Sequence, residues 1–210
     1  MKIRVASLAA SLLLGLIAAV CHAQDFSADI AYDPIQTQDR GPRSVPPNAS
    51  SRIYVSKDKM RLESRGLNDT ILLVDFGNHT ATVFFPSQKA YQQLSELPGQ
   101  YFPVTNAEDA CPDWQKAVGR QVTCAKIGNE KVGGRQAIKY EGKGVSASGP
   151  STLVWIDPVL KFVVKWQDAE GGAELHNVKE GPQSADLFVV PSSYDVLKPK
   201  KRAPTRKHSS

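Results

Sequence analysis

The sequence predicts a mainly β protein, built on a single curved antiparallel sheet with one or few short helices. Short runs rich in β-branched and aromatic residues recur along the chain, separated by turn-forming residues such as Gly, Pro, Asn and Asp. About nine such runs stand at meander spacing against one good helix candidate, which argues against alternating strands and helices around a parallel sheet. No repeat with a fixed period is visible.

The chain begins with an export signal. Met1–Arg4 is basic, Val5–Val20 is apolar, and Cys21-His22-Ala23 has small residues at both ends of a cleavage site. The apolar run is shorter than the roughly 20 residues that a spanning helix needs. We therefore predict that residues 1–23 are a cleaved signal peptide. Lipid anchoring at Cys21 is not expected, because Val20 precedes it where a small residue belongs.

The mature chain has the length of one domain, which we assign to residues 24–197. All 21 acidic residues lie between Asp25 and Asp195. The excess of basic residues behind the formal charge of +5 is therefore at the two ends of the chain. Residues 198–210 form a basic tail without a single acid, and we predict that it is disordered. The tail is either a solvated terminus or an arm that contacts an anionic membrane surface through Lys198–Lys207. Export excludes nucleic acid as its partner.

The first half of the mature chain predicts six strands. They are Phe26–Tyr32, Arg52–Val55, Lys59–Glu63, Thr70–Phe76, Thr80–Phe85 and Lys89–Leu94. The Pro-rich stretch Asp33–Ser51 has no period and predicts a loop. The Thr70–Phe76 and Thr80–Phe85 strands are apolar on both faces, which indicates that a helix, a loop or a ligand covers the second face.

A helix and a disulfide are expected next. Asn106–Val118 has a possible N-cap at Asn106 and an apolar stripe that includes Trp114. Cys111 and Cys124 are the two thiols left after export, and such a pair usually forms a bridge in an oxidising compartment. This bridge would link the helix to a strand at Thr123–Ile127. Another strand, Gln136–Tyr140, precedes a Gly/Ser loop at Gly142–Pro150.

The last third contains the clearest pattern. Leu153–Ile156 and Lys161–Trp166 form a hairpin around Asp157-Pro158, with Phe162, Val164 and Trp166 expected on one face and Lys161, Val163 and Lys165 on the other. After Gly171-Gly172, the run Ala173–Val178 predicts another strand. Leu187–Pro191 is expected to end the sheet, with the proline at a strand end.

The same region carries a family resemblance. The Trp-Ile-Asp-Pro turn at Trp155–Pro158, the Gly turn, the Asn177-Val178 pair and the run Leu187–Val196 resemble the C-terminal half of the bacterial outer-membrane lipoprotein carriers. They resemble more closely an uncharacterised secreted family placed beside those carriers. In outline the resemblance covers residues 51–196.

The resemblance implies a half-open barrel in the periplasm. Its inner side would be apolar and lidded by helices, although the loop Asp33–Ser51 could serve as the lid here. The carriers are also associated with a cationic residue near the cavity. Arg52 and Arg61 both lie in the matching region, and the sequence does not choose between them.

Catalytic motifs are weak. Gly142–Ala147 fits a dinucleotide-binding glycine pattern and Gly144–Ser148 nearly fits a nucleophile elbow, but no helix follows either of them. His79, His176 and His208 form no metal-binding pair. We therefore expect no enzyme activity, no metal and no cofactor, and a hydrolase using Ser146 or His176 ranks last among the hypotheses.

The apolar residues of the two-sided strands and of the hairpin are the candidate ligand surface, against the alternative of an ordinary core. These candidates are Leu72, Val74, Phe84, Phe85, Trp155, Phe162 and Trp166. The leading hypothesis is a non-enzymatic periplasmic protein that holds lipid or the acyl chains of a lipoprotein in an apolar concavity. The alternative is an envelope-stress sensor or structural module that binds a protein partner through the same fold.

Overall fold

The computed structural model describes residues 25–33, 50–66, 69–144, 151–169 and 171–197. The predicted signal peptide and basic tail lie outside the described residues. So do most of the loop Asp33–Ser51 and the stretch 145–150, which contains Ser146.

The described residues form one sheet of twelve strands, in the order β12-β6-β5-β4-β3-β2-β1-β11-β10-β9-β8-β7. Its strands are β1 (Phe26–Tyr32), β2 (Ser50–Ser56), β3 (Lys59–Arg65), β4 (Thr70–Asp75), β5 (Thr80–Phe85), β6 (Ala90–Leu94), β7 (Thr123–Val132), β8 (Arg135–Lys143), β9 (Thr152–Asp157), β10 (Phe162–Gln167), β11 (Gly172–Glu180) and β12 (Asp195–Val196). All neighbours are antiparallel except β12 and β6. The predicted fold class is confirmed.

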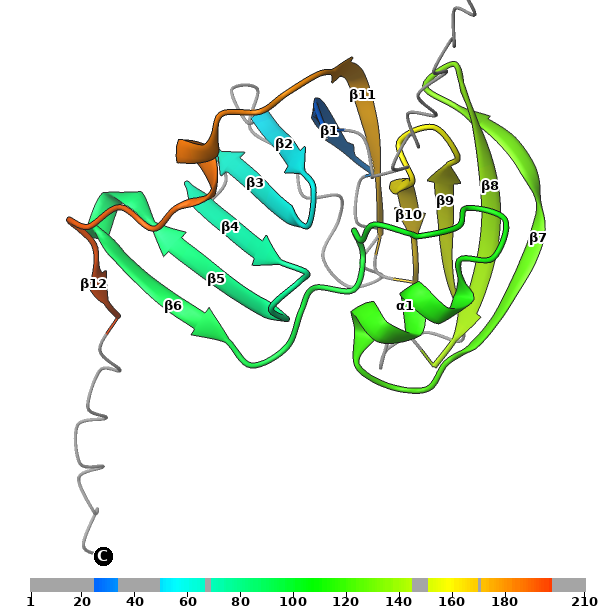
Figure 1. Ribbon diagram of the computed structural model, residues 1–210, viewed down its shortest axis with the longest axis horizontal. Helices are drawn as coiled ribbons and strands as arrows, with labels where there is room; N and C mark the ends of the chain where they lie inside the picture. Colours follow the sequence, from blue (N-terminus) through cyan, green and yellow to red (C-terminus); the bar gives the residue numbers. More distant parts are fainter. Residues whose placement is uncertain (1–24, 34–49, 67–68, 145–150, 170, 198–210) are drawn as a thin grey trace, which may run out of the picture.

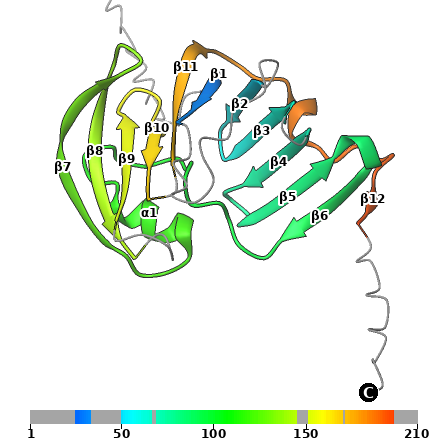
Figure 2. The same cartoon turned by 180° about the vertical axis from the view of Figure 1, so that it is seen from behind.

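The sheet has two arms. Figures 1 and 2 show β2–β6 on one side and β7–β10 on the other, joined through β1 and β11. The helix α1 (Cys111–Val118) lies with the β7–β10 arm. Turn chemistry supports the hairpins: Gly133 and Gly134 both have positive φ in the two-residue loop between β7 and β8, as a type I′ turn requires.

One face of the sheet, called the inner face below, carries the hydrophobic core. The inner face includes a row of directly paired residues across β1–β5, none of which exposes more than 2% of its surface. This row is Phe26, Val55, Met60, Val74 and Ala81. Apolar burial of this kind contributes about 25 cal/mol per Å², so the row is a main source of stability.

The chain covers much of the inner face with its own residues between β6 and β7. Phe102 and Trp114 stack at 6.0 Å between ring centroids and are almost completely buried. The backbone of this segment is fixed by the start of β10, since Val163 N donates to Phe102 O and Val104 N donates to Lys161 O. This connecting segment therefore replaces the lid of several helices that the resemblance implied.

The predicted alternation along β10 is wrong. Lys165 pairs with Trp155 and Val163 pairs with Ile156, so the register shifts by one residue between them. A bulge of this kind shifts the alternation by one residue, so that side chains after it point to the opposite face from the one predicted. Phe162, Val163 and Val164 are all buried. β10 pairs with β11 only from Lys165 onward, and the connecting segment occupies the space beside its first residues.

The helix starts later than predicted. It begins at Cys111 after the N-cap Ala110, because Pro112 is tolerated only in the first turn. Asn106 instead forms its own turn, in which its side-chain Oδ1 accepts a hydrogen bond from Glu108 N at 3.0 Å. Of the expected stripe, Ala110 and Trp114 are buried and Val118 is half-buried, and Ala117 is buried as well.

The C-terminal run is not the predicted strand. Ala185–Phe188 is a 3₁₀ helix, η2, and the chain joins the sheet only at β12, beside β6. On the other face of the sheet, the outer face, Phe188 and Val190 line a pocket together with Leu73 and Thr82, while Val189 and Val190 stay exposed. The high β-propensity of this run therefore did not make it a strand of the sheet.

The predicted disulfide joins Cys111 of α1 to Cys124 of β7, with a sequence separation of 13 residues. Closing a loop of this length contributes about 3 kcal/mol.

We expect reduction of this disulfide with dithiothreitol to lower the free energy of unfolding by about that amount, measured by urea denaturation. A double variant, Cys111→Ser with Cys124→Ser, serves as the control and should not respond to the reductant. An unchanged midpoint on reduction of the wild type would contradict the assignment.

Candidate functional site

The second row of inner-face residues changes from buried to half-buried along its length. Ala28 and Ile53 are completely buried, whereas Leu62 and Leu72, the next two residues of the row, are not. Four half-buried apolar side chains at this end form what we call the inner apolar surface. These are Leu62, Leu72, Val83 and Phe85.

Polar groups border the inner apolar surface. Ser64 follows Leu62 on the same face of β3 and pairs with Ser51 of β2. Burial raises the pKa of Tyr32, at the end of β1, and hydrogen bonding with the hydroxyls of Ser51 and Ser64 offsets only part of this rise. Tyr32 therefore stays neutral at physiological pH, and this border is polar but uncharged.

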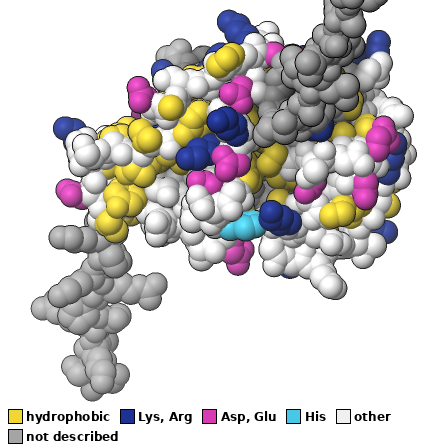
Figure 3. Space-filling model, viewed as in Figure 1, with side chains coloured by type: hydrophobic (Ala, Val, Ile, Leu, Met, Phe, Trp, Pro, Cys, Tyr) yellow, Lys and Arg dark blue, Asp and Glu magenta, His cyan; other side chains and the backbone are white. Residues whose placement is uncertain are grey.

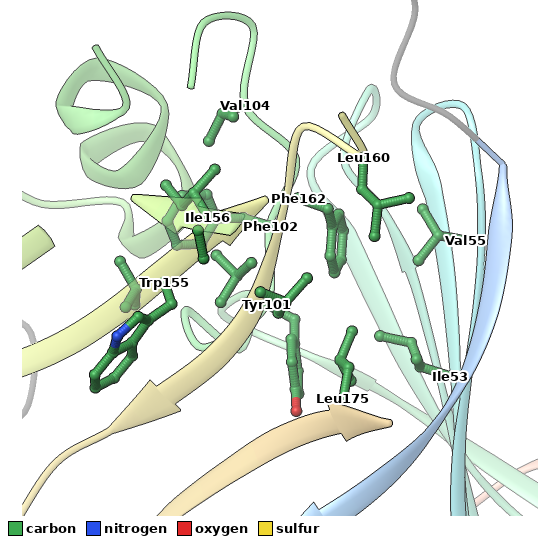
Figure 4. Close-up of a cluster of buried hydrophobic side chains, with 14 of the residues drawn as sticks. Ile53, Val55, Tyr101, Phe102, Val104, Trp155, Ile156, Leu160, Phe162 and Leu175 are labelled. Atoms are coloured by element: carbon green, nitrogen blue, oxygen red, sulfur yellow. The ribbon is translucent and has the colours of Figure 1, made fainter. Parts of the chain in front are cut away.

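Tyr101 of the connecting segment reaches the same region from the core. Its ring stacks on Phe162 at 6.3 Å, and Figure 4 shows its hydroxyl pointing away from the Leu160 and Phe162 end of the cluster. Burial strongly raises the pKa of Tyr101, and the neighbouring Tyr32 adds to this rise. The Trp166 indole lies beside the hydroxyl and interacts with it, and neither Tyr101 OH nor Trp166 Nε1 has a further hydrogen-bond partner among the described residues.

The structure divides the seven residues of the predicted ligand surface into three groups. Leu72, Phe85 and Trp166 lie on the inner face and are half-buried, the first two in the inner apolar surface and Trp166 on β10. Val74 and Phe162 are core residues with 2% and 0% exposure. The remaining two, Phe84 and Trp155, lie on the outer face.

Trp155 lies on the outer face of β9, surrounded by charged side chains. Its indole Nε1 donates to Glu130 Oε2 at 2.7 Å, and the ammonium groups of Lys139 and Lys165 lie over its ring at 4.7 and 5.2 Å. Its exposure is 3%. Cation–π contacts and an ion-paired neighbour therefore account for this tryptophan without a ligand.

Phe84 is covered by the C-terminal segment. Tyr194 packs on its ring edge to face at 5.8 Å, and Tyr91 lies beside it at 6.2 Å. The two-sided apolar character of β5 thus has a physical account: its outer face is covered by the chain itself. On the inner face, Leu72, Val83 and Phe85 of the same two strands are half-buried.

Arg52 and Arg61, the two candidates for a cation near the cavity, both project from the outer face. Arg52 Nη1 lies 2.6 Å from Asp29 Oδ1, and its guanidinium stacks on Tyr54. Arg61 donates to Glu63 Oε1 at 2.7 Å and to the backbone oxygen of Leu187 at 3.0 Å. Arg61 therefore anchors the C-terminal segment rather than lining the inner face.

A cleft of about 310 Å³ opens at a different place, between the β4–β5 turn, the connecting segment and α1. Its apolar walls are Phe76, Leu97, Phe102 and Val104, and Asp58, Asp113, Lys116 and Lys161 are its charged lining residues. Asp113 accepts a hydrogen bond from Thr105 N at 2.6 Å. Space for a small ligand thus exists near the core, but the mixed charges indicate no ligand class.

The structure assembles no catalytic group around the described residues of the hydrolase hypothesis. His176 is exposed on the outer face, with Nε2 3.7 Å from Glu174 Oε1. Within the described ranges, no three His, Cys, Asp or Glu side chains come together as metal ligands. No helix in the described part of the chain is long and apolar enough to cross a membrane.

Sequence reasoning missed Leu62, Val83 and Tyr101. Leu62 and Val83 follow from alternation, since they share a face with Leu72 once the strands are paired. Tyr101 gave no such signal, because it lies in a segment without a regular hydrophobic period. Only the backbone hydrogen bonds of that segment with the start of β10 place Tyr101 against the inner face.

No protein-family model matches the sequence, and neither does any curated protein. Among solved structures, an uncharacterised conserved protein from Thermus thermophilus is 11% identical with a TM-score of 0.51, over 83% of this chain and 90% of that one. PNGF-II is 12% identical with a TM-score of 0.51, over 84% of this chain and 31% of that one. A LolA superfamily protein from Nitrosomonas europaea is 11% identical with a TM-score of 0.39, over 80% of this chain and 90% of that one.

These likenesses concern the fold alone. The lipoprotein-carrier superfamily named from the sequence is represented among the matched structures. At 11–12% identity, function has to be argued from the chain's own residues.

Glu63 provides a pH-dependent test of the outer-face ion pairs. Burial alone would raise the pKa of its carboxyl, but hydrogen bonds from Arg61 and Arg65 outweigh burial and lower it. The stabilisation is then complete above the unfolded pKa near 4.5 and is lost as the pH falls through the lower folded pKa. We expect Glu63→Gln to cost about 1.5–3 kcal/mol at neutral pH and to flatten the acid dependence of stability.

The measurement is urea denaturation between neutral pH and the acid limit of the fold. Glu96→Gln, at an exposed position after β6, is the matched control and should keep the wild-type pH dependence. A Glu63→Gln protein with the same acid slope as the wild type would show that the ion pairs contribute nothing.

Proposed function

We propose that this protein is an exported, non-enzymatic binding protein that holds an acyl chain, from a lipid or an acylated protein, against the inner apolar surface. The observation that supports the proposal is local. The first row of the inner face is buried, whereas the second row ends in the half-buried Leu62, Leu72 and Val83, with the half-buried Phe85 next to them on the same face. Each methylene buried there would contribute about 0.8 kcal/mol, with no polar group to satisfy.

The mechanism is shielding during transit through the periplasm. An acyl chain leaves water for the inner apolar surface, and it is released when an acceptor offers a more complete apolar enclosure. No bond is made or broken, so the function needs no nucleophile, metal or cofactor. The predicted tail Lys198–Lys207 would add contact with anionic head groups, at about 1 kcal/mol per basic residue near the surface.

Two adjacent residues of β4 give a matched test. Leu72 faces the inner apolar surface, whereas Leu73 faces outward beside Phe188, and both are half-buried. We expect Leu72→Ser to weaken binding of a fluorescent fatty-acid ester about tenfold, because it removes one leucine contact. Leu73→Ser should lose similar stability but keep the wild-type affinity. Equal affinities in the two variants, or no uptake by the wild type, would refute the proposed site.

A protein partner is the second candidate, and the exposed apolar residues of the C-terminal segment favour it. Val189 and Val190 expose 54% and 43% of their surfaces next to the outer face, and β12 pairs with only Ala90 and Tyr91 of β6. Figure 3 shows hydrophobic side chains gathered over β4–β6. Apolar patches beside an incompletely paired strand edge are typical of protein interaction sites.

The partner hypothesis predicts a stoichiometric protein in pull-downs from an envelope extract. We expect Val189→Ser with Val190→Ser to abolish capture and Leu72→Ser to leave it intact. If Leu72→Ser alone abolished capture, the partner would bind through the inner apolar surface, as an acylated protein does.

A further inference from the structure

Two buried donor groups lie near Tyr32, whose hydrogen bonds with Ser51 and Ser64 form the polar border of the inner apolar surface. Tyr101 OH and Trp166 Nε1 lie side by side, close enough to interact with each other, and neither has a further hydrogen-bond partner among the described residues. Tyr101 as a whole exposes only 4% of its surface. A third such atom, Thr152 Oγ1, belongs to a residue two positions before Val154, the residue that pairs with Trp166.

Leaving such donors unpaired is costly. A buried polar group without a partner loses its hydration and gains nothing in exchange. Native proteins satisfy most such groups, so an adjacent pair calls for an acceptor. The position of this pair matters, because Tyr32 connects it to Ser51 and Ser64, and Ser64 borders Leu62.

The surroundings define the chemistry of that acceptor. The cations of β2 and β3 do not face it, since Arg52, Arg61 and Arg65 all pair with partners on the outer face. Tyr32 and Tyr101 are neutral at physiological pH, since the pKa of each lies above the ordinary value of a phenol. A carboxylate would enter this environment without a counter-ion, whereas a carbonyl oxygen can accept two hydrogen bonds and carries no charge.

We infer that Tyr101 and Trp166 select an acyl group by its ester or amide carbonyl, with the attached chain lying along the inner apolar surface. This inference rests on the proposed function and adds a specificity to it. The protein would distinguish an esterified or amide-linked chain from a free fatty acid and from a plain hydrocarbon of the same length. Tyr101 and Trp166 would thus determine specificity, and the apolar residues would supply the bulk of the affinity.

The test is displacement of a bound fluorescent fatty-acid ester by three competitors of equal chain length. These are tetradecane, methyl tetradecanoate and tetradecanoate. We expect the wild type to prefer the methyl ester over the alkane and over the carboxylate by about tenfold, the effect of two modest hydrogen bonds. Tyr101→Phe should abolish most of the preference for the ester over the alkane, leave the alkane affinity unchanged, and not lower the stability of the empty protein.

Trp166→Phe is the second variant and should have the same effect, while Tyr91→Phe, on the outer face, should keep the wild-type preference. If alkane and ester displace the probe equally, or if Tyr101→Phe keeps the wild-type preference, the donors are satisfied by water and the inference fails while the proposed function stands. A stronger displacement by the carboxylate also overturns it. A wild type that takes up no probe refutes the proposed function and this inference with it.

Discussion

A single curved sheet has an inner face that must be covered, and this requirement organises the rest of the molecule. No second sheet lies opposite it among the described residues. The chain meets the requirement with the segment between β6 and β7, which inserts Phe102 and Trp114 against the β7–β10 arm. The backbone hydrogen bonds of Phe102 and Val104 to the start of β10 fix this segment, and the disulfide at Cys111 holds the helix that follows.

The same arrangement explains why the inner apolar surface lies where it does. One segment with one short helix covers the core row, but it leaves Leu72 and Phe85 half-buried at the far end of β4 and β5. On the outer face the C-terminal segment covers the equivalent strands, with Tyr194 on Phe84 and Arg61 bonded to Leu187. Of the two aromatic residues at the end of β5, Phe84 on the outer face is therefore covered and Phe85 on the inner face is half-buried, and the proposed function depends on the half-buried inner residues.

Local pattern was sufficient for most of the sheet and insufficient wherever tertiary contacts override it. Alternation and turn residues predicted the ends of β1 to β5 to within two residues, because each strand carries its own signal. The bulge in β10 has no such signal, since it arises from the insertion of the connecting segment beside Phe162. The run Leu187–Pro191 has the composition of a strand but packs across the sheet as a 3₁₀ helix and coil. For the candidate ligand surface, the sequence predicted Leu72, Phe85 and Trp166, which lie on the inner face, together with Trp155, which does not, because alternation does not say which face is inward.

The most direct test of the account is native mass spectrometry of the mature protein purified from the envelope of its host, followed by organic extraction of bound molecules. We expect a stoichiometric ligand with an acyl chain to leave the protein on extraction, and the Leu72→Ser protein to carry little of it. A wild-type protein that is folded, with Cys111 and Cys124 oxidised, and that consistently carries no acyl-bearing molecule would contradict the account.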